Sequence, residues 1–428
     1  MKSSFYQQLF LKTLRNIRKG RLVIKLPDQS YHFFGEGNQS ECVEWIIHDS
    51  NCFKRIILAE DIGLGESYIE GMWEVNDLTA FLRLLIENRD HLRSSKLRPL
   101  AKIGKNILLL TERLKHAANS NSKNQSIRNI HAHYDLGNDF YQTFLDGGMA
   151  YSSAFFSDPN QSLEDAQFEK NDRLCRKLSL KPQHHLLEIG SGWGGFSIHA
   201  AKLYGCRVTT VTISEEQFAF AKQRIADEGL EDRIEIRFQD YRDIKGKFDR
   251  IASVEMLEAV GHEHLHSYFK QCSNLLKPEG IIGIQVILSP DSRYRYYRGR
   301  VDYIRKHIFP GGHLPSISSI QKQVGKHSDW DLQHFESFGK HYAETLRRWD
   351  ETFMSASEQR RQLGFDKAFE RKWHFYFCYC EAGFDSRHIQ VGQFIFASPN
   401  NFDLDTENSL EVRPAVPLKT KTRQQAQA

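Results

Sequence analysis

A glycine-rich segment carries the clearest chemical signal in the sequence. It follows an apolar run, and its glycines recur at every second position. Glycine lets a backbone approach a ligand closely, and the order strand, glycine turn, helix does this in nucleotide-binding sheets. The residues concerned are Leu187, Glu188, Gly190, Ser191, Gly192, Trp193 and Gly194. The spacing G-x-G-x-G differs from dinucleotide and phosphate-loop motifs. It therefore favours a nucleoside without phosphates, with S-adenosylmethionine as the leading candidate; the alternative is a tight turn that binds no ligand.

Polar side chains recur where three later strands are predicted to end. They are Thr212, Ser214 and Gln217 after the second strand, Gln239 and Asp240 after the third, and Glu255 and Glu258 after the fourth. We expect the first group to hydrogen-bond a ribose, and the second to reach the adenine, whose exocyclic amine suits a carboxylate acceptor. Glu258 is the better catalytic candidate because it lies farther past its strand. Any one of these residues could instead be a helix cap or a surface acid.

The elements that must position these residues alternate regularly. Apolar, β-rich runs predict strands at 185–189, 207–213, 234–238, 250–254 and 281–288, with helices at 215–227 and 264–276 between them. Alternation of this kind predicts a parallel sheet with ligands at the carboxyl ends of its strands. The predicted class is α/β, a Rossmann-like S-adenosylmethionine-dependent methyltransferase fold with a smaller α+β N-terminal domain.

The pattern divides the chain into four parts. They are an N-terminal α+β domain at 1–114, a linker at 115–129, a catalytic domain at 130–400 and a disordered tail at 401–428. Within the first part we predict a helix at 3–18, strands at 21–26, 30–34 and 42–47, and helices at 62–73 and 78–88. The first helix has an apolar stripe beside basic residues, so it could lie in a membrane interface or dock on its own domain. Lipid or membrane docking is the role expected of this domain.

Bulk properties narrow the class of protein. The chain has 428 residues, a net charge of +4 and seven scattered cysteines with no C-x-x-C pair. These features argue for a reducing compartment, with neither a disulfide framework nor a zinc site, and no metal ligands are proposed. The sequence contains neither a signal peptide core nor an apolar run near the ~20 residues of a membrane span. We therefore expect a cytoplasmic protein, peripheral on the inner face of the membrane.

Several motifs together resemble one family, the cyclopropane-fatty-acyl-phospholipid synthases and mycolic acid methyltransferases. The resemblance runs from about Ile130 to Phe396, and the N-terminal part weakly matches the lipid-binding domain of the bacterial synthases. The matching segments are 133–139, Tyr151-Ser152, 187–195, 211–214 with Gln217, 239–243, 276–280, 303–304, 308–312, and 338–346 in part. This resemblance implies that Tyr151 and Ser152 also contact S-adenosylmethionine.

The resemblance also implies a reaction. The double bond of an unsaturated phospholipid acyl chain takes up a methyl group, a carbocation forms, and loss of a proton closes a cyclopropane ring. In the family a bicarbonate ion is the base. Of the residues that hold it, Glu258 and Tyr342 match, whereas Ser153 stands at a cysteine position and Gln285 at a histidine position. Cys380 matches a cysteine often marked as active-site, although its apolar neighbours favour a structural role.

Three alternatives remain open. The departures at Ser153 and Gln285, with Glu255 where the synthases usually have a small residue, allow C-methylation to methylene or methyl-branched chains without ring closure. The arginine and tyrosine run at 293–305 suits single-stranded nucleic acid as well as phospholipid headgroups, but we expect no nucleic-acid partner because the net charge is low. The chain could also be a non-catalytic lipid-binding relative. A homodimer is a further option.

Overall fold

The computed structural model describes residues 5–38, 42–93, 136–399, 401 and 404. The predicted linker at 115–129 lies outside the described residues, as does nearly all of the predicted tail. Two sheets organise the described part, a four-stranded sheet near the N-terminus and a seven-stranded sheet in the rest of the chain. Within these ranges, none of the helices combines the length and the apolar character that crossing a bilayer requires.

The N-terminal sheet has the strand order β2-β1-β3-β4. Its strands are β1 (Arg21–Lys25), β2 (Tyr31–Phe34), β3 (Cys42–Ile47) and β4 (Trp73–Val75), and its helices are α1 (Phe5–Leu14), α2 (Asn51–Ala59), α3 (Asp61–Ile69), α4 (Leu78–Glu87) and α5 (Arg89–Arg93). Alternating burial along β1 and β3 places one face of the sheet in a core around Trp45 and Trp73. The predicted helix at 62–73 ends early, because Trp73 pairs with Ile47 in the sheet.

The large sheet has the order β10-β11-β9-β8-β5-β6-β7. Its strands are β5 (His185–Ile189), β6 (Arg207–Thr212), β7 (Ile234–Phe238), β8 (Phe248–Val254), β9 (Leu276–Leu288), β10 (Asp331–Ser337) and β11 (Gln390–Ala397). Pairing is parallel from β7 through β6, β5 and β8 to β9. This confirms the predicted Rossmann-like α/β class. The five strands predicted between residues 185 and 288 are parallel, as expected, and two further strands that were not predicted, β11 and β10, add antiparallel at one edge.

Adjacent residues on the strands enter different cores. Leu186, Ala252 and Ile281 pack with α9 (Leu163–Lys177), α10 (Gly195–Tyr204) and α11 (Glu215–Asp227). Their neighbours Leu187 and Ile282 pack with α12 (Leu265–Leu275) and α15 (Ile317–His327). Since side chains alternate along a strand, the two cores lie on opposite faces of the sheet. Helices therefore cover both faces and leave the strand ends as the place for a site.

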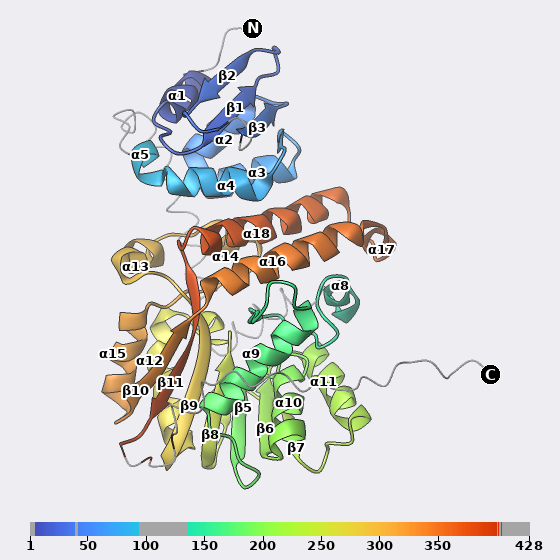
Figure 1. Cartoon of the computed structure of the whole chain (residues 1–428), viewed down its shortest axis with the longest axis vertical. Helices are drawn as coiled ribbons and strands as arrows, with labels where there is room; N and C mark the ends of the chain where they lie inside the picture. The colour runs from blue at the N-terminus through green and yellow to red at the C-terminus, as the bar shows by residue number, and fades with distance from the viewer. Residues whose placement is uncertain (1–4, 39–41, 94–135, 400, 402–403, 405–428) are drawn as a thin grey trace, which may run out of the picture.

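A layer of helices lies between the two sheets (Figure 1). It contains α16 (Gly339–Ser355) and α18 (Lys367–Asp385), flanked by α17 (Ser357–Gln362), α8 (Asn138–Gln142), α13 (Asp291–Arg298) and α14 (Tyr303–His307). Arg371 of α18 donates hydrogen bonds to the carbonyls of Tyr68 (2.6 Å) and Trp73 (3.0 Å). Thr79 of α4 donates to Glu381 at 2.9 Å. These contacts hold the N-terminal sheet and its helices on the layer that covers the strand ends.

Candidate active site

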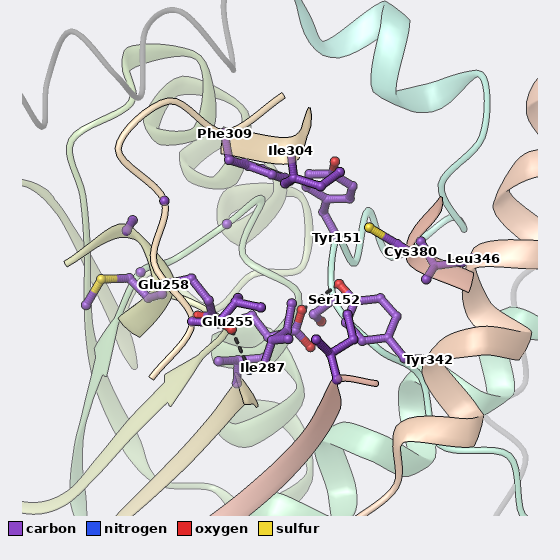
Figure 2. A pocket seen from close by; sticks show the side chains of 18 of the residues that line it. Tyr151, Ser152, Glu255, Glu258, Ile287, Ile304, Phe309, Tyr342, Leu346 and Cys380 are labelled. Atoms are coloured by element: carbon purple, nitrogen blue, oxygen red, sulfur yellow. Dashed lines mark hydrogen bonds between the residues drawn. The ribbon is translucent and has the colours of Figure 1, made fainter. Parts of the chain in front are cut away.

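One cavity of about 1470 Å³ runs from the carboxyl ends of the parallel strands to the N-terminal helices. The glycine segment, the ends of β6, β7 and β8, and residues of α16 and α18 line it. Apolar residues of α1, α2 and α4 complete the wall. Figure 2 shows its centre, where Glu255 lies between Glu258 and Tyr342, with Tyr151, Leu346 and Cys380 bordering the same space. The cavity can therefore hold a polar group at the sheet and an apolar chain beyond it.

The glycine segment follows β5 as predicted and turns into α10. The N–H groups of Gly190 and Ser191 both donate to the carbonyl of Val211, at 3.1 and 2.9 Å. Gly190, Gly192 and Gly194 have positive φ values of 94°, 49° and 87°, which explains their residue type. A Cβ on Gly190 would meet Met256 at 3.0 Å, whereas one on Gly192 would meet no atom within 4 Å. Gly192 thus presents open backbone to the cavity, as a nucleoside ligand requires.

The next two strand ends also reach the cavity. Thr212 and Gln217 line it, and the Thr212 hydroxyl donates to the Gln217 side chain at 3.1 Å. Gln239 and Asp240 line it after β7. The Asp240 carboxylate already accepts two hydrogen bonds from the Arg242 guanidinium, at 2.8 and 2.6 Å, which fixes its direction. Open glycine backbone, a hydroxyl, amides and a fixed carboxylate fit the donor and acceptor groups of S-adenosylmethionine.

A loop at 146–152 closes this end of the cavity. Asp146 accepts from the N–H groups of Gly148 and Ala150, and Arg224 donates to the carbonyls of both Gly148 and Trp193 at 2.9 Å. The buried Lys170 ammonium donates to the Ser152 hydroxyl at 2.9 Å, and burial lowers the pKa of Lys170 to about 8. The loop is thereby tied to the glycine segment, with Tyr151 and Ser152 on the cavity wall.

Glu255 is the centre of the polar end. Its Oε1 accepts from the backbone N–H of Ser153 and from the Gln285 side-chain amide, both at 2.8 Å. Its Oε2 accepts from the Tyr342 hydroxyl at 2.7 Å. Burial raises the pKa of Glu255, and the three donors oppose that rise. Burial also holds the pKa of Tyr342 far above its usual range, so the phenol stays protonated and donates a hydrogen bond to Glu255.

Glu258 lies beside this carboxylate in a different environment. Its Oε1 accepts from the Ile287 N–H at 2.6 Å, and its Oε2 is fully buried with no partner among the described residues. Burial first, and then the charge of Glu255, raises the pKa of Glu258 to about 8. Glu258 therefore holds a proton at neutral pH. Three donors stabilise the charge of the Glu255 carboxylate and only one contacts Glu258, so Glu258 is the member of the pair that takes up a proton more readily.

Not every residue proposed from the sequence reaches the cavity wall. Leu187, Gly194, Ser214, Ser153 and Gln285 are absent from the lining. Leu187 is buried in the sheet core, and the Ser214 hydroxyl accepts from the Gln217 N–H as the cap of α11. Gly194 starts α10 and approaches Ala221. Ser153 and Gln285 do not line the cavity, and they contribute through the hydrogen bonds that they donate to Glu255.

The remaining predicted residues line the cavity. Glu188 accepts from the Thr210 hydroxyl at 2.6 Å, and burial raises its pKa to about 8. The Trp193 indole donates to Asn138 at 2.6 Å. Cys380 faces the cavity from α18, and burial raises the pKa of its thiol far above the usual range. A thiol so far from ionisation is a poor nucleophile, which agrees with the structural role favoured from its neighbours.

Sequence reasoning missed the role of two residues. Glu255 was considered as the weaker of two catalytic candidates and as a departure from the family pattern, and Gln393 was not considered. Gln393 donates to the Gln285 Oε1 at 3.0 Å and itself accepts from Lys177 at 2.7 Å. This sets the direction of the Gln285 amide, so that its Nε2 points at Glu255. Two carboxylates three positions apart were the available signal, and Glu255 is the nearer of them to β8.

A cluster of possible metal ligands lies away from the cavity. His374 and Cys378 of α18 and Asp350 of α16 come within 4.8 Å of one another. The His374 Nδ1 and the Asp350 carboxylate lie 2.8 Å apart, as a hydrogen bond requires. None of the three lines the cavity, so the group takes no part in the chemistry considered below.

Comparison with known proteins identifies the family of the chain. The family model of mycolic acid cyclopropane synthetase matches residues 121–394. The chain is 40% identical over 340 residues to the tuberculostearic acid methyltransferase UfaA1 of Mycobacterium tuberculosis, covering 78% of each chain. It is 36% identical over 358 residues to the cyclopropane-fatty-acyl-phospholipid synthase of Escherichia coli K12, covering 82% of this chain and 87% of that one.

Solved structures give the same result. The mycolic acid cyclopropane synthase CmaA1 in complex with SAH and CTAB superposes with a TM-score of 0.60 at 29% identity, covering 64% of this chain and 98% of that one. The fold, the open glycine segment and these relatives together show an S-adenosylmethionine-dependent methyltransferase that modifies lipid chains. The chain belongs to the mycolic acid cyclopropane synthetase family.

Proposed function

We propose that the protein methylates the cis double bond of unsaturated phospholipid acyl chains and converts it to a cyclopropane ring. The observation that supports this most is the continuity of the cavity, which joins the cofactor residues to a mainly apolar extension. When bound, S-adenosylmethionine supplies an electrophilic methyl group. The residues of the chain then have three tasks, which are to place the double bond, exclude water and accept a proton.

The apolar extension suits an acyl chain. Phe10, Leu82 and Leu85 of the N-terminal helices line one end, while Ile304 and Phe309 line the part nearer the sheet. An alkene is a weak nucleophile, so a water-poor wall around it protects the reaction. The methylated alkene is a carbocation, and the rings of Tyr151, Phe309 and Tyr342 border its place and offer π faces.

A cationic cluster supports a phospholipid as the substrate. Arg89 of α5, Arg293 of α13 and His388 after α18 all line the cavity, on the side of the molecule where these elements meet (Figure 1). Arg293 donates to the His388 Nδ1 at 2.7 Å, and the Arg89 guanidinium lies 3.4 Å from the same ring. Asp90 is 3.4 Å from Arg89. Two guanidinium groups at one point suit a phosphodiester, which Arg binds with paired hydrogen bonds.

Exposed aromatic residues support docking on a membrane surface. Phe5, Tyr31 and Phe33 of the N-terminal part are 56%, 54% and 64% exposed. Aromatic side chains are favoured at the interface between lipid and water. We place the protein on the cytoplasmic face of the membrane, with α1 and β2 toward the lipid.

A second product deserves the same test. A carbocation that shifts a hydride before losing its proton gives a methylene branch, and the Glu255 carboxylate near the reaction centre is an acceptor that serves either route. Both products gain one CH2, because each loses one proton. A saturated methyl branch would need a separate hydride donor.

The test is incubation of the protein with S-adenosylmethionine and vesicles of a cis-monounsaturated phospholipid. Mass spectrometry of the released acyl chains should show the gain of one CH2, and NMR should show cyclopropane protons. Vinylidene protons would instead identify the methylene product. Saturated phospholipid vesicles are the control, and no mass gain on unsaturated lipid would refute the proposal.

A further inference from the structure

The polar end of the cavity already contains a fixed anion of the protein's own. The Glu255 carboxylate accepts hydrogen bonds from the Ser153 N–H, the Gln285 amide and the Tyr342 hydroxyl, at 2.8, 2.8 and 2.7 Å. These are the groups that, by resemblance to the family, would hold a bicarbonate ion. Since a hydrogen bond needs a donor with a free N–H or O–H, the three are no longer available to a bound anion.

Electrostatics also disfavours a second anion here. Bicarbonate would have to bind directly beside the Glu255 carboxylate at the polar end of the cavity. Like charges in such a site repel strongly, and one of them normally takes up a proton. Lys170 is a buried cation whose charge acts on Glu255, and its ammonium donates a hydrogen bond to the Ser152 hydroxyl. The residues present therefore do not fit a bicarbonate site.

The backbone at Glu255 is built for this arrangement. Glu255 has a φ of +49°, which is uncommon for a residue with a side chain. Its N–H donates to the Gln285 carbonyl at 2.8 Å, and this bond holds the turn. Strained backbone that its surroundings enforce is frequent at functional sites. Gln393 donates a hydrogen bond to Gln285 and accepts one from Lys177, which fixes the orientation of the Gln285 amide. Gln285 and Gln393 are therefore positioning residues.

We propose that the Glu255 carboxylate itself accepts the proton lost from the transferred methyl carbon, in the place where relatives of this family hold bicarbonate. This inference rests on the proposed function and names the base of that same reaction. In the step, the π electrons of the alkene form the new C–C bond as the S–CH3 bond breaks, and that bonding pair stays on sulfur. A C–H bond of the new methyl group then breaks, its electrons close the ring, and the proton passes to the Glu255 Oε2.

Glu255→Gln tests the assignment directly, because the amide keeps the size of the side chain but cannot act as the base. Turnover on unsaturated phospholipid vesicles should fall about 10²–10⁴-fold, the usual contribution of a positioned general base. Binding of S-adenosylhomocysteine by calorimetry should match the wild type, which shows that the cofactor site is intact. Glu279→Gln, on the exposed surface of β9, is the matched control.

Bicarbonate provides the second readout. Wild-type turnover should be the same in CO2-stripped buffer and in buffer with added bicarbonate. Glu255→Ala leaves a space beside three freed donors. Added bicarbonate or formate should therefore raise the turnover of this variant at least tenfold. Wild-type turnover that depends on bicarbonate, or a Glu255→Gln variant within threefold of wild type, would overturn the assignment alone. A wild type without product under every condition would refute the proposed function and the assignment with it.

Discussion

Replacement of Glu258 by glutamine should make the protein more stable at high pH than the wild type. The folded protein holds the pKa of Glu258 at about 8, against 4.5 as the ordinary value for Glu. Below about pH 4.5 the carboxyl is protonated in both the folded and the unfolded chain, so it does not affect stability. As the pH rises toward 8, only the unfolded chain loses the proton, and the free energy of unfolding falls. Above the folded pKa this loss is complete.

The size of the effect follows from the shift. One pKa unit corresponds to about 1.4 kcal/mol, so the wild type should lose on the order of 3 kcal/mol between pH 5 and pH 8 relative to Glu258→Gln. Glutamine retains an oxygen to accept from the Ile287 N–H, so that contact is preserved. Urea unfolding followed by circular dichroism at both pH values measures the difference, with Glu279→Gln as the control. If the free energy of unfolding depended on pH equally in the wild type and in Glu258→Gln, Glu258 would be ionised in the folded protein. That result would contradict the different protonation proposed for the two carboxyl groups.

Three further variants test other parts of the site. Cys380→Ser should keep turnover within about threefold of wild type in the vesicle assay, because burial keeps the thiol protonated. A loss of turnover above 100-fold would show that Cys380 has a catalytic role. Gly190→Ala should weaken S-adenosylhomocysteine binding at least tenfold by calorimetry, since its Cβ would meet Met256 at 3.0 Å and its φ is +94°. Arg89→Ala with Arg293→Ala should raise the KM for phospholipid vesicles about tenfold or more while leaving turnover at saturation nearly constant; an unchanged KM would remove the phosphodiester from this cluster.

The sequence predicted the parallel part of the large sheet well. Its strands are short apolar runs separated by helical patterns, and the glycine segment predicts the turn where the cofactor is expected to bind. These signals are local, because side-chain period and glycine content depend on neighbouring positions. The antiparallel edge was not predicted, since β11 joins β9 across more than a hundred residues and no local pattern encodes that pairing.

The choice between Glu255 and Glu258 depends on contacts of the same long range. Distance past the strand favoured Glu258, but the positive φ of Glu255 turns its side chain toward Tyr342, which is 87 positions away along the chain. The N-terminal part of the cavity was hidden for another reason. Leu82 and Leu85 read as core residues of an ordinary amphipathic helix, and only the packing of α4 against α18 shows that part of this helix borders the cavity.

The most direct test of the account uses a methyl donor that carries three deuterium atoms on the transferred carbon. After turnover on cis-monounsaturated phospholipid vesicles, the acyl chains should gain CD2, because one deuteron passes from that carbon to the base. Both the cyclopropane and the methylene product share this result. Acyl chains that keep all three deuterium atoms would contradict proton removal from the transferred carbon, and chains without deuterium would contradict methyl transfer to the lipid.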